Sequence, residues 1–343
     1  MVAELSGNHN GDLGRALALI DAAHAAGADA VKLQTYTADT LTLDHDGPQF
    51  CIASGPWAGR RLYDLYDWAH TPWDWHEALF ARAHALGLSI FSAPFDPTAV
   101  AFLERFRPPA YKIASFELVD LPLIECAAAT GRPLILSTGL ASPDEVDEAV
   151  AAARRGRAGG GFDADDNDWL LLLHCVSGYP SAPGEARLGA MTVLRRRTGL
   201  AVGLSDHSLG TAVAVAGTAL GAAMIEKHLI LRRAYGGPDA GFSMESHEFA
   251  ALCRDCRLAW EATAARPPAN DRAAASERPS AVFRRSLFVV DDVAAGAPLT
   301  PANVRSIRPA GGLAPKFLPE VIGRRAARAL SRGSPLAWDM IAP

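Results

Sequence analysis

The stretch that decides the fold is VGLSDHSLGTAVAVAGTALGAAMIEKHL, residues 202–229. It holds two short apolar runs, each followed by a histidine, and His207 and His228 are 21 residues apart. That spacing matches one helix-and-strand step, because parallel strands need a crossover connection between them. The two histidines are therefore predicted to lie at the ends of neighbouring strands.

The same step recurs along most of the chain. Up to about residue 263, apolar runs of strand length alternate with stretches of helical spacing, a pattern typical of a parallel sheet crossed by helices. The expected strands are 2–6, 30–34, 89–92, 110–115, 134–138, 169–175, 201–205 and 223–228. Eight such repeats predict an α/β fold of the (β/α)8 TIM-barrel type. An open sheet would need a GxGxxG phosphate loop after its first strand, and GNHNGD is not one.

Two domains are predicted. Residues 1–263 would form the barrel, and residues 264–281 have the proline, alanine, serine and charge content of a linker. Residues 282–343 contain short β-like runs at 287–290 and 304–307 among frequent glycine and proline. They are expected to form a small β-rich domain.

Composition limits the possible partners and compartment. The net charge of −5 gives no basic surface for nucleic acid or an anionic membrane. No apolar run is long enough to span a membrane, and the first residues show no signal peptide. The five cysteines lack the spacing of a disulfide framework. A cytoplasmic protein without nucleic-acid or membrane partners is expected.

Lysine is scarce in this chain. Of the 33 basic residues only four are lysines, namely Lys32, Lys112, Lys227 and Lys316. The first three fall in predicted strands, where a lone lysine is unusual. Either codon usage left them there, or something at these positions prevents the exchange for arginine.

Polar residues gather at the ends of the predicted strands. They are Glu4, Lys32, Gln34, Ser92, Lys112, Ser115, Glu117, Ser137, Thr138, Ser205, His207, Lys227 and His228. Active sites of TIM barrels lie at the C-terminal ends of strands and in the loops that follow. Because a buried charge is costly unless it is paired, the convergence of several predicts a bound ligand.

Two kinds of chemistry are expected at this mouth. Lys32 and Lys112, with the hydroxyls of Ser92, Ser115, Ser137 and Ser205, would suit a phosphate ester. The alternative is that each serine bonds to local backbone. His207 and His228 would share a divalent metal whose open positions leave room for water and substrate. The alternative is two unrelated structural histidines.

The connection after the second strand, residues 35–71, is much longer than a usual βα loop and rich in aromatic residues. A loop of this length is usually functional. It is predicted to form a lid or a wall of the substrate site.

Ordered blocks along the barrel resemble the sialic acid synthase family: AELSGNHNGDL, GADAVKLQTY, FSAPFD, AYKIASFEL, LILSTGL, LLHCVSGYP, VGLSDHSLG, IEKHL and GGPDAGFSM. The tail blocks RRSLFVV, NVRSIRPAGGL and GSPLAWDMI resemble the antifreeze-like (SAF) domain of that family, which has a β-clip fold. Within the family, YTADTLTLD, the loop at 54–76, FRRSLFVV and LAWDMI are most similar to pseudaminic acid synthases.

The resemblance implies a transferase that condenses phosphoenolpyruvate (PEP) with an N-acylated amino-sugar aldehyde and releases phosphate. For the pseudaminic subfamily the aldehyde would be 2,4-diacetamido-2,4,6-trideoxy-L-altrose. The product would be a nine-carbon 2-keto acid for surface glycans. A domain-swapped homodimer is also implied.

The resemblance further implies a role for each matching residue. His207 and His228 match the ligands of Mn²⁺ or Mg²⁺, with Co²⁺ as a further candidate. Glu4 matches a catalytic glutamate near the reacting carbons. The PEP-binding positions are Lys32, Lys112, Ser115, Ser137 and Ser205, with Ser92 added from the strand-end pattern. The sugar-binding positions are Gln34, Glu117, Tyr179, Asp239 and Arg308, the last from the partner subunit's SAF domain.

Several alternatives remain at this stage. The sugar would differ in an N-acetylneuraminate or legionaminate synthase. A Schiff-base aldolase would use Lys112 or Lys227 as its nucleophile. A non-catalytic sugar sensor would need no metal ligands. The chain also departs from the family at Ala93, where threonine is common, and at LILRR, residues 229–233, where FTLDR is usual.

Overall fold

The computed structural model describes residues 1–264 and 274–343. The chain divides into two compact units, Met1–Ala264 and Ala265–Pro343. Half of the predicted linker, residues 265–273, lies outside the described residues. Its described end belongs to a 3-10 helix, Ala275–Phe283, with exposed side chains.

The first unit contains a closed parallel barrel. Each strand from β1 to β8 pairs with the next, and β8 pairs back with β1, which places Glu4 opposite His228. The barrel strands are β1 Val2–Glu4, β2 Ala30–Thr35, β3 Ser89–Pro94, β4 Tyr111–Ile113, β5 Leu134–Ser137, β6 Leu170–Cys175, β7 Ala201–Ser205 and β8 Ile225–Ile230. A short ninth strand, β9 Met244–Glu245, pairs in parallel with Leu229 and Ile230 at the end of β8. The predicted TIM barrel is confirmed.

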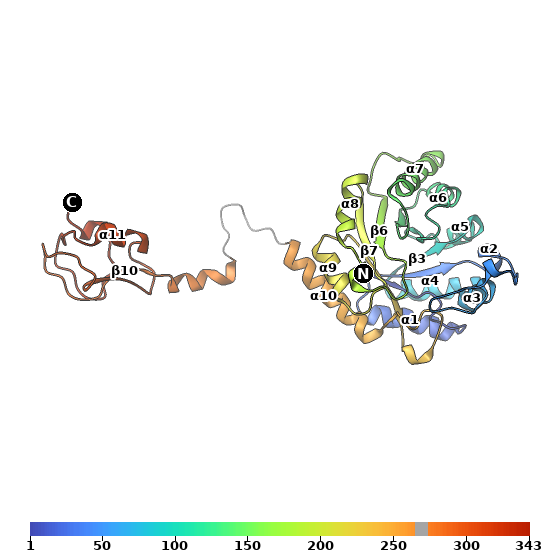
Figure 1. Ribbon diagram of the computed structural model, residues 1–343, viewed down its shortest axis with the longest axis horizontal. Helices are drawn as coiled ribbons and strands as arrows, with labels where there is room; N and C mark the ends of the chain where they lie inside the picture. Colours follow the sequence, from blue (N-terminus) through green and yellow to red (C-terminus); the bar gives the residue numbers. More distant parts are fainter. Residues whose placement is uncertain (265–273) are drawn as a thin grey trace. The chain divides into compact units, whose positions relative to one another are not determined.

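Helices surround the strands, as Figure 1 shows. They are α1 Leu13–Ala25, α2 Ala38–Leu41, α3 Leu62–Ala69, α4 His76–Ala85, α5 Pro97–Leu103, α6 Leu121–Ala128, α7 Pro143–Gly159, α8 Gly189–Thr198, α9 Ala212–Ala219 and α10 Ser246–Ala264. Residues at the helix ends explain where several of these helices begin and end. Asp12 caps α1, and Ser142 with Glu145 forms a capping box before Pro143 of α7. Gly27, with φ +85°, turns the chain from α1 toward β2.

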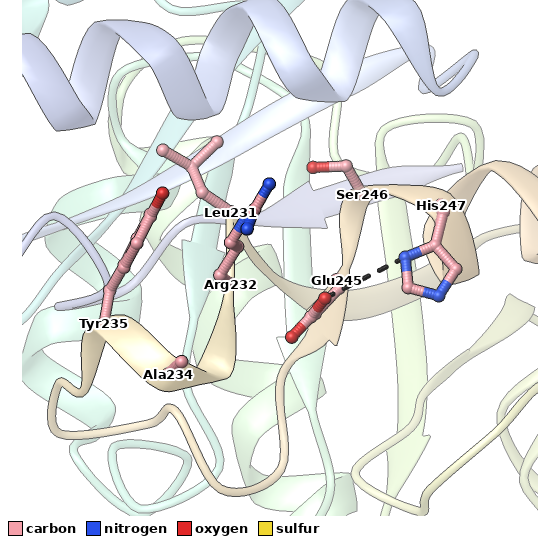
Figure 2. Close-up of a pocket in the computed structure, with 7 residues that line it drawn as sticks. All are labelled: Leu231, Arg232, Ala234, Tyr235, Glu245, Ser246 and His247. Atoms are coloured by element: carbon pink, nitrogen blue, oxygen red, sulfur yellow. Dashed lines mark ion pairs between the residues drawn. The ribbon is translucent and has the colours of Figure 1, made fainter.

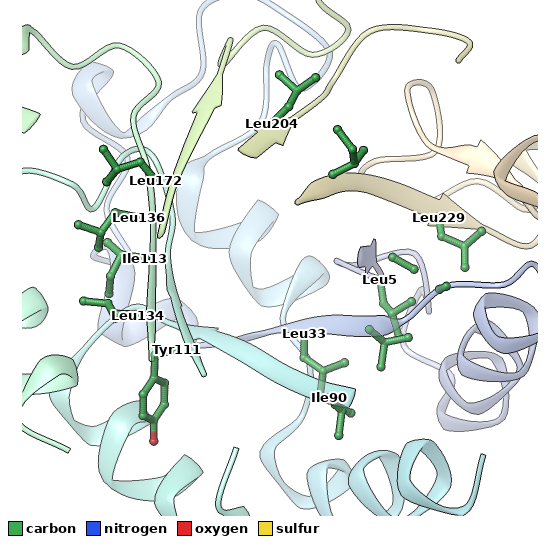
Figure 3. Packing of buried hydrophobic residues seen from close by; sticks show 14 of the residues in the cluster. Leu5, Leu33, Ile90, Tyr111, Ile113, Leu134, Leu136, Leu172, Leu204 and Leu229 are labelled. Atoms are coloured by element: carbon green, nitrogen blue, oxygen red, sulfur yellow. The ribbon is translucent and has the colours of Figure 1, made fainter. Parts of the chain in front are cut away.

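The strands alternate between two environments. Most side chains facing the helices are apolar, and Leu33, Ile90, Tyr111, Leu136 and Leu204 are among those that pack in one continuous core (Figure 3). Facing inward, Val2, Ala30, Phe91, Ile135 and Leu173 form a separate apolar cluster. We call these five residues the barrel floor.

Most of the next inward positions above the floor carry polar or thiol groups, with Ala93 on β3 as the exception. Two residues further along their strands come Glu4, Lys32, Ser137 and Cys175. Because side chains alternate along a strand, each of these points to the same interior as the floor residue two positions before it. A polar layer thus lies directly on an apolar one.

The long connection after β2 is partly helical. It contains α2, a 3-10 turn at Pro48–Phe50 and α3. The segment between them, residues 51–61, is closed by a bridge between Cys51 and Arg61. The connection therefore has fixed structure of its own.

The second unit has a small core around one antiparallel ladder. Strand β10, Ser286–Val289, pairs with β11, Val304–Ile307, and a short helix, α11, covers Leu318–Val321. Ten buried apolar residues, including Leu287, Val304 and Leu336, make up its core. Among the described residues of both units, no helix is long and apolar enough to cross a membrane.

Candidate active site

The centre of the barrel mouth is a network of one lysine and two glutamates. Lys32 Nζ on β2 lies 2.6 Å from Glu4 Oε2 on β1 and 3.5 Å from Glu226 Oε1 on β8. All three side chains are almost completely buried. Glu226 was not among the residues predicted from the sequence.

Burial and charge act in opposite directions on these groups. Burial favours the neutral amine of Lys32, but the carboxylates of Glu226 and Glu4 outweigh it and raise the pKa of Lys32. Burial likewise opposes ionisation of Glu226, but Lys112 and Lys32 outweigh it and lower the pKa of Glu226. For Glu4 burial prevails and raises the pKa. The site therefore keeps Glu226 as its anion and Lys32 as a cation.

Lys112 is the unusual cation of the site. It is 2% exposed on β4, and its Nζ donates to the carbonyl oxygen of Ile113 at 3.2 Å. No carboxylate among the described residues lies within ion-pair distance of it, and burial lowers its pKa. A buried ammonium without a carboxylate paired to it is costly. An anionic ligand would remove that cost.

Two of the predicted serines lie in the same interior layer. Ser205 Oγ on β7 donates to Glu226 Oε1 at 3.2 Å, and Ser137 is 2% exposed on β5. Ser115 lies just beyond β4, with its Oγ 2.9 Å from Ser177 Oγ after β6. These hydroxyls and Lys112 offer hydrogen-bond donors to an anion.

Ser92 is not brought to this cluster. Its Oγ lies 2.6 Å from Thr35 Oγ1, which also contacts His76 Nε2 of α4 at 2.7 Å. The neighbouring strand positions, Phe91 and Ala93, face inward instead. The prediction that Ser92 binds PEP therefore assigned the wrong face of β3, and Ala93, which has no hydroxyl, holds the interior place.

His207 and His228 lie side by side, with ring centroids 5.4 Å apart. His207 Nδ1 is 2.9 Å from the carbonyl oxygen of Val176. A carbonyl only accepts, so Nδ1 carries the proton and Nε2 keeps its lone pair. Burial lowers the pKa of both histidines, and the neighbouring His207 lowers that of His228 further. Both rings are therefore neutral at pH 7.

The donor set suits a divalent metal. Neutral imidazoles are good metal ligands, and His228 Nδ1 is buried without a hydrogen-bond partner. Asp239 Oδ2 is 3.5 Å from that nitrogen. Within residues 1–264 and 274–343 no group of three or more histidine, cysteine or carboxylate side chains is placed to hold an ion. Two imidazoles would leave the remaining positions of a metal to water or substrate.

Polar residues extend from this centre toward the mouth. Gln34 Nε2 donates to Glu4 Oε1 at 2.9 Å and to Ser6 Oγ at 3.2 Å, and Ser6 Oγ donates to Asp239. Burial raises the pKa of Asp239 to about 6 and that of Glu117 to about 7. Glu117 Oε2 is buried without a hydrogen-bond partner. Four predicted sugar contacts, Gln34, Glu117, Asp239 and Tyr179, thus lie around the central network or beside the histidines.

An aromatic wall stands beside the histidines. Tyr179 lies 4.5 Å from His207 and Phe242 lies 5.0 Å from His228, between ring centroids. Trp57 of the long connection packs 5.7 Å from Tyr179 and donates from Nε1 to the carbonyl oxygen of Pro238 at 2.7 Å. We call Trp57, Tyr179 and Phe242 the aromatic wall. Trp57 and Phe242 were missed from sequence.

Side-chain alternation was the signal that could have found Glu226. His228 faces inward, so the residue two positions earlier on β8 faces inward as well. Lys227, between them, faces the helices and pairs with Asp206 at 2.5 Å. The predicted cluster of strand-end residues therefore included Lys227 where Glu226 belonged.

Arg308 and one surface pocket complete the description. Arg308 belongs to the second unit, where it is exposed just after β11. Figure 2 shows a surface pocket lined by Leu231, Arg232, Ala234, Tyr235, Glu245, Ser246 and His247. Leu231 and Arg232 of the LILRR stretch line it, but none of the predicted site residues does. Of the departing positions, Arg232 thus lines this surface pocket, whereas Leu229 and Ile230 are buried.

Known proteins are similar to this chain over nearly its whole length. The chain is 42% identical to the pseudaminic acid synthase of Helicobacter pylori, over 99% of this chain and 97% of that one. It is 32% identical to the N,N'-diacetyllegionaminic acid synthase of Legionella pneumophila, over 99% and 94% of the two chains.

A solved structure of a related synthetase also resembles the chain in its fold. An N-acetylneuraminic acid synthetase from Leptospira borgpetersenii, in complex with citrate, has a TM-score of 0.68 and 29% identity, over 81% of this chain and 88% of that one. The sequence also matches the SAF domain over residues 284–342 and the NeuB family over residues 19–266. With its barrel and tail matched in this order, the chain belongs to the NeuB family.

Proposed function

We propose that the chain is a pseudaminic acid synthase, which condenses PEP with 2,4-diacetamido-2,4,6-trideoxy-L-altrose to pseudaminic acid and phosphate. The observation that carries the choice of sugar is relatedness. Three pseudaminic acid synthases are 40–42% identical to the chain over nearly its whole length, against 32% for a legionaminic acid synthase. The enzyme class follows from the same relatives.

The site supports each partial reaction. Lys112, with Ser115, Ser137 and Ser205, would bind the anionic groups of PEP, because its ammonium is buried and no carboxylate of the described residues lies within ion-pair distance of it. C3 of PEP then bonds to the aldehyde carbon, and the aldehyde oxygen takes a proton. Water adds to C2, and the C2–O bond to phosphate breaks. Glu4 and Glu226 are the carboxyl groups placed to move protons during these steps.

The histidine pair would hold a metal. A divalent cation bound by His207 and His228, Mn²⁺, Mg²⁺ or Co²⁺, would supply a Lewis acid for the aldehyde oxygen. Gln34, Asp239 and Tyr179 would orient the sugar, since they contact Glu4, His228 and His207. Glu117 would join them, since its buried carboxyl is close enough to Lys112 and Lys32 to interact with their charges.

A Schiff-base aldolase is the main alternative chemistry. Lys227 is poorly suited to it, because its amine faces the helices and is paired with Asp206. Lys112 is better suited, since burial lowers its pKa and so favours the neutral amine that a Schiff base requires. Borohydride trapping in the presence of substrate would support the aldolase. Loss of activity with a chelator and recovery with Mn²⁺ would support the synthase.

The direct test measures phosphate released from PEP with three aldehydes in parallel. These are the trideoxy-diacetamido altrose, the corresponding legionaminic acid precursor and N-acetylmannosamine. We expect the altrose to give the highest kcat/KM. A higher value for either other sugar would overturn the assignment of substrate, and no release with any of them would favour a non-catalytic sensor.

We further propose a domain-swapped homodimer in which Arg308 reaches the partner's site, and a cytoplasmic location. Opposite net charges of the two parts of the chain support the domain-swapped homodimer. Residues 1–264 carry 21 basic and 32 acidic side chains, whereas residues 265–343 carry 12 basic and 6 acidic ones, so the second part of one chain can attract the first part of its partner. Mixing R308A with H207A should restore part of the activity if sites are shared between chains. Absence of rescue would place the whole site in one chain.

A further inference from the structure

Lys227 occupies an unusual place for a lysine. It is in the middle of β8, 1% exposed, and faces the helices while Glu226 and His228 face the barrel interior. Its Nζ donates to Asp206 Oδ2 at 2.5 Å and to the carbonyl oxygen of Ser208 at 2.6 Å. One buried ammonium thus binds the residues immediately before and after His207.

The segment carrying His207 is fixed by further contacts. Asp206 Oδ1 accepts from the backbone nitrogen of Ser208 at 2.9 Å and from its hydroxyl at 2.7 Å. The carbonyl oxygen of His207 accepts from the backbone nitrogen of Ser181 at 3.1 Å. Asp206, Lys227 and Ser208 therefore form a closed polar cluster on the outer side of the barrel. His207 projects from that cluster into the site.

We infer that Lys227 is a positioning residue for His207. It lies on the opposite face of the sheet from the reacting groups, so it cannot touch substrate. By holding Asp206 and Ser208 together it fixes the direction in which the imidazole of His207 enters the interior. The inference rests on the proposed function only for the role of His207 as a metal ligand.

The cost of burying the Lys227–Asp206 ion pair favours a functional reason for keeping it. A buried ion pair is seldom the most stable choice, since apolar residues of similar volume often stabilise a fold equally well. Lysine offers a compact charge with three donors, two of which are used here, whereas the planar guanidinium of arginine is larger. A positioning role would explain why lysine remains at this position in a chain where arginine is the usual cation.

The test compares three variants. K227M removes the ammonium but leaves Asp206 buried and unpaired, which alone can prevent folding. D206N/K227M removes both charges together. R132M is the matched control, because Arg132 pairs with the half-buried Glu104 away from the site. Each variant is measured for thermal midpoint, Mn²⁺ affinity, kcat and the KM for PEP.

We expect D206N/K227M to fold with a midpoint similar to that of R132M, with kcat and Mn²⁺ affinity each at least about tenfold lower, as for other groups that orient metal ligands. The KM for PEP should stay within about twofold, because Lys32 pairs with Glu4 and Glu226 and Lys112 donates to the carbonyl oxygen of Ile113, whereas Lys227 pairs with Asp206 on the other face. Equal kcat and equal Mn²⁺ affinity in D206N/K227M and R132M would overturn the inference.

A spectroscopic readout separates this inference from the proposed reaction. In protein labelled with ¹³C at histidine Cε1, the His207 signal should shift or broaden in D206N/K227M and stay sharp in R132M. An unchanged signal would refute the positioning role even if condensation were never observed. Absence of condensation in the wild type would instead contradict the proposed function.

Discussion

His207 and His228 have their ring centroids 5.4 Å apart at the ends of adjacent strands, and both rings are held in the neutral form by burial. His207 is oriented through Nδ1 by the carbonyl oxygen of Val176. The pair thus has the tautomer, charge state and proximity needed to share an ion.

The first prediction concerns these two histidines. H207A and H228A should each lower condensation and Mn²⁺ affinity by more than about a hundredfold, because losing a ligand costs more than losing the group that orients it. Isothermal titration with Mn²⁺ and phosphate release give the two readouts. H84A is the control, since His84 is exposed on α4. Normal turnover in either site variant would refute the shared metal.

The second prediction concerns Glu226. E226Q removes the anion beside Lys32 and Lys112 while keeping the volume and the bond from Ser205. We expect kcat to fall by about a hundredfold, the scale of a lost acid or base, while the KM for PEP does not rise. Steady-state kinetics with E104Q as control provide the check. A tenfold rise in that KM with normal kcat would mean that Glu226 only supports Lys32.

The third prediction concerns the aromatic wall. W57A should raise the KM for the sugar by up to about tenfold, because an aromatic contact of this kind contributes about 0.5–1.5 kcal/mol. The KM for PEP should change little, since the cationic end of the site is untouched. W260A is a matched control on α10, where Trp260 is 61% exposed. Equal effects on both substrates would point to a general loss of loop structure.

The fourth prediction uses the pKa of Glu117. Burial raises this pKa to about 7, so the neutral acid, which can donate a hydrogen bond, is lost as the pH rises through 7. The KM for the sugar should therefore increase between pH 6 and pH 8 in the wild type. E117Q keeps a donor that does not ionise and should give a flat profile over this range. If E117Q retains the wild-type slope, another group is responsible.

The fifth prediction concerns stability. Burial lowers the pKa of His76 from 6.5 to about 4, so the folded state binds this proton less readily than the unfolded state. The resulting stability is present above pH 6.5 and is lost as the pH falls toward 4, by about 3 kcal/mol. Urea unfolding at several pH values should show a weaker acid dependence in H76Q than in the wild type. Parallel curves would contradict the assignment.

The sequence was enough to predict the barrel and most of its mouth. Hydrophobic periodicity and helix caps are local signals, and they placed Glu4, Lys32, Lys112 and the two histidines at strand ends. Ser92 and Lys227 were misplaced for one reason. A strand end gives the depth of a residue in the barrel, but the alternation of faces decides which side it occupies.

Tertiary contacts were not predictable in the same way. Trp57 meets Tyr179 and Phe242 across more than a hundred residues of sequence, through a connection without regular periodicity. Similarly, no local sequence pattern predicts that Lys227 on the next strand binds both Asp206 and Ser208. Such pairings depend on the closed strand order, which only the folded barrel provides.

The barrel floor limits the routes by which ligands can enter and leave the site. Val2, Ala30, Phe91, Ile135 and Leu173 close the bottom of the interior with apolar side chains. Under the proposed function, substrates and products would therefore enter and leave at the C-terminal ends of the strands. Phosphate still bound beside Lys112 would then occupy the place of the next PEP, so free phosphate should compete with PEP for this site.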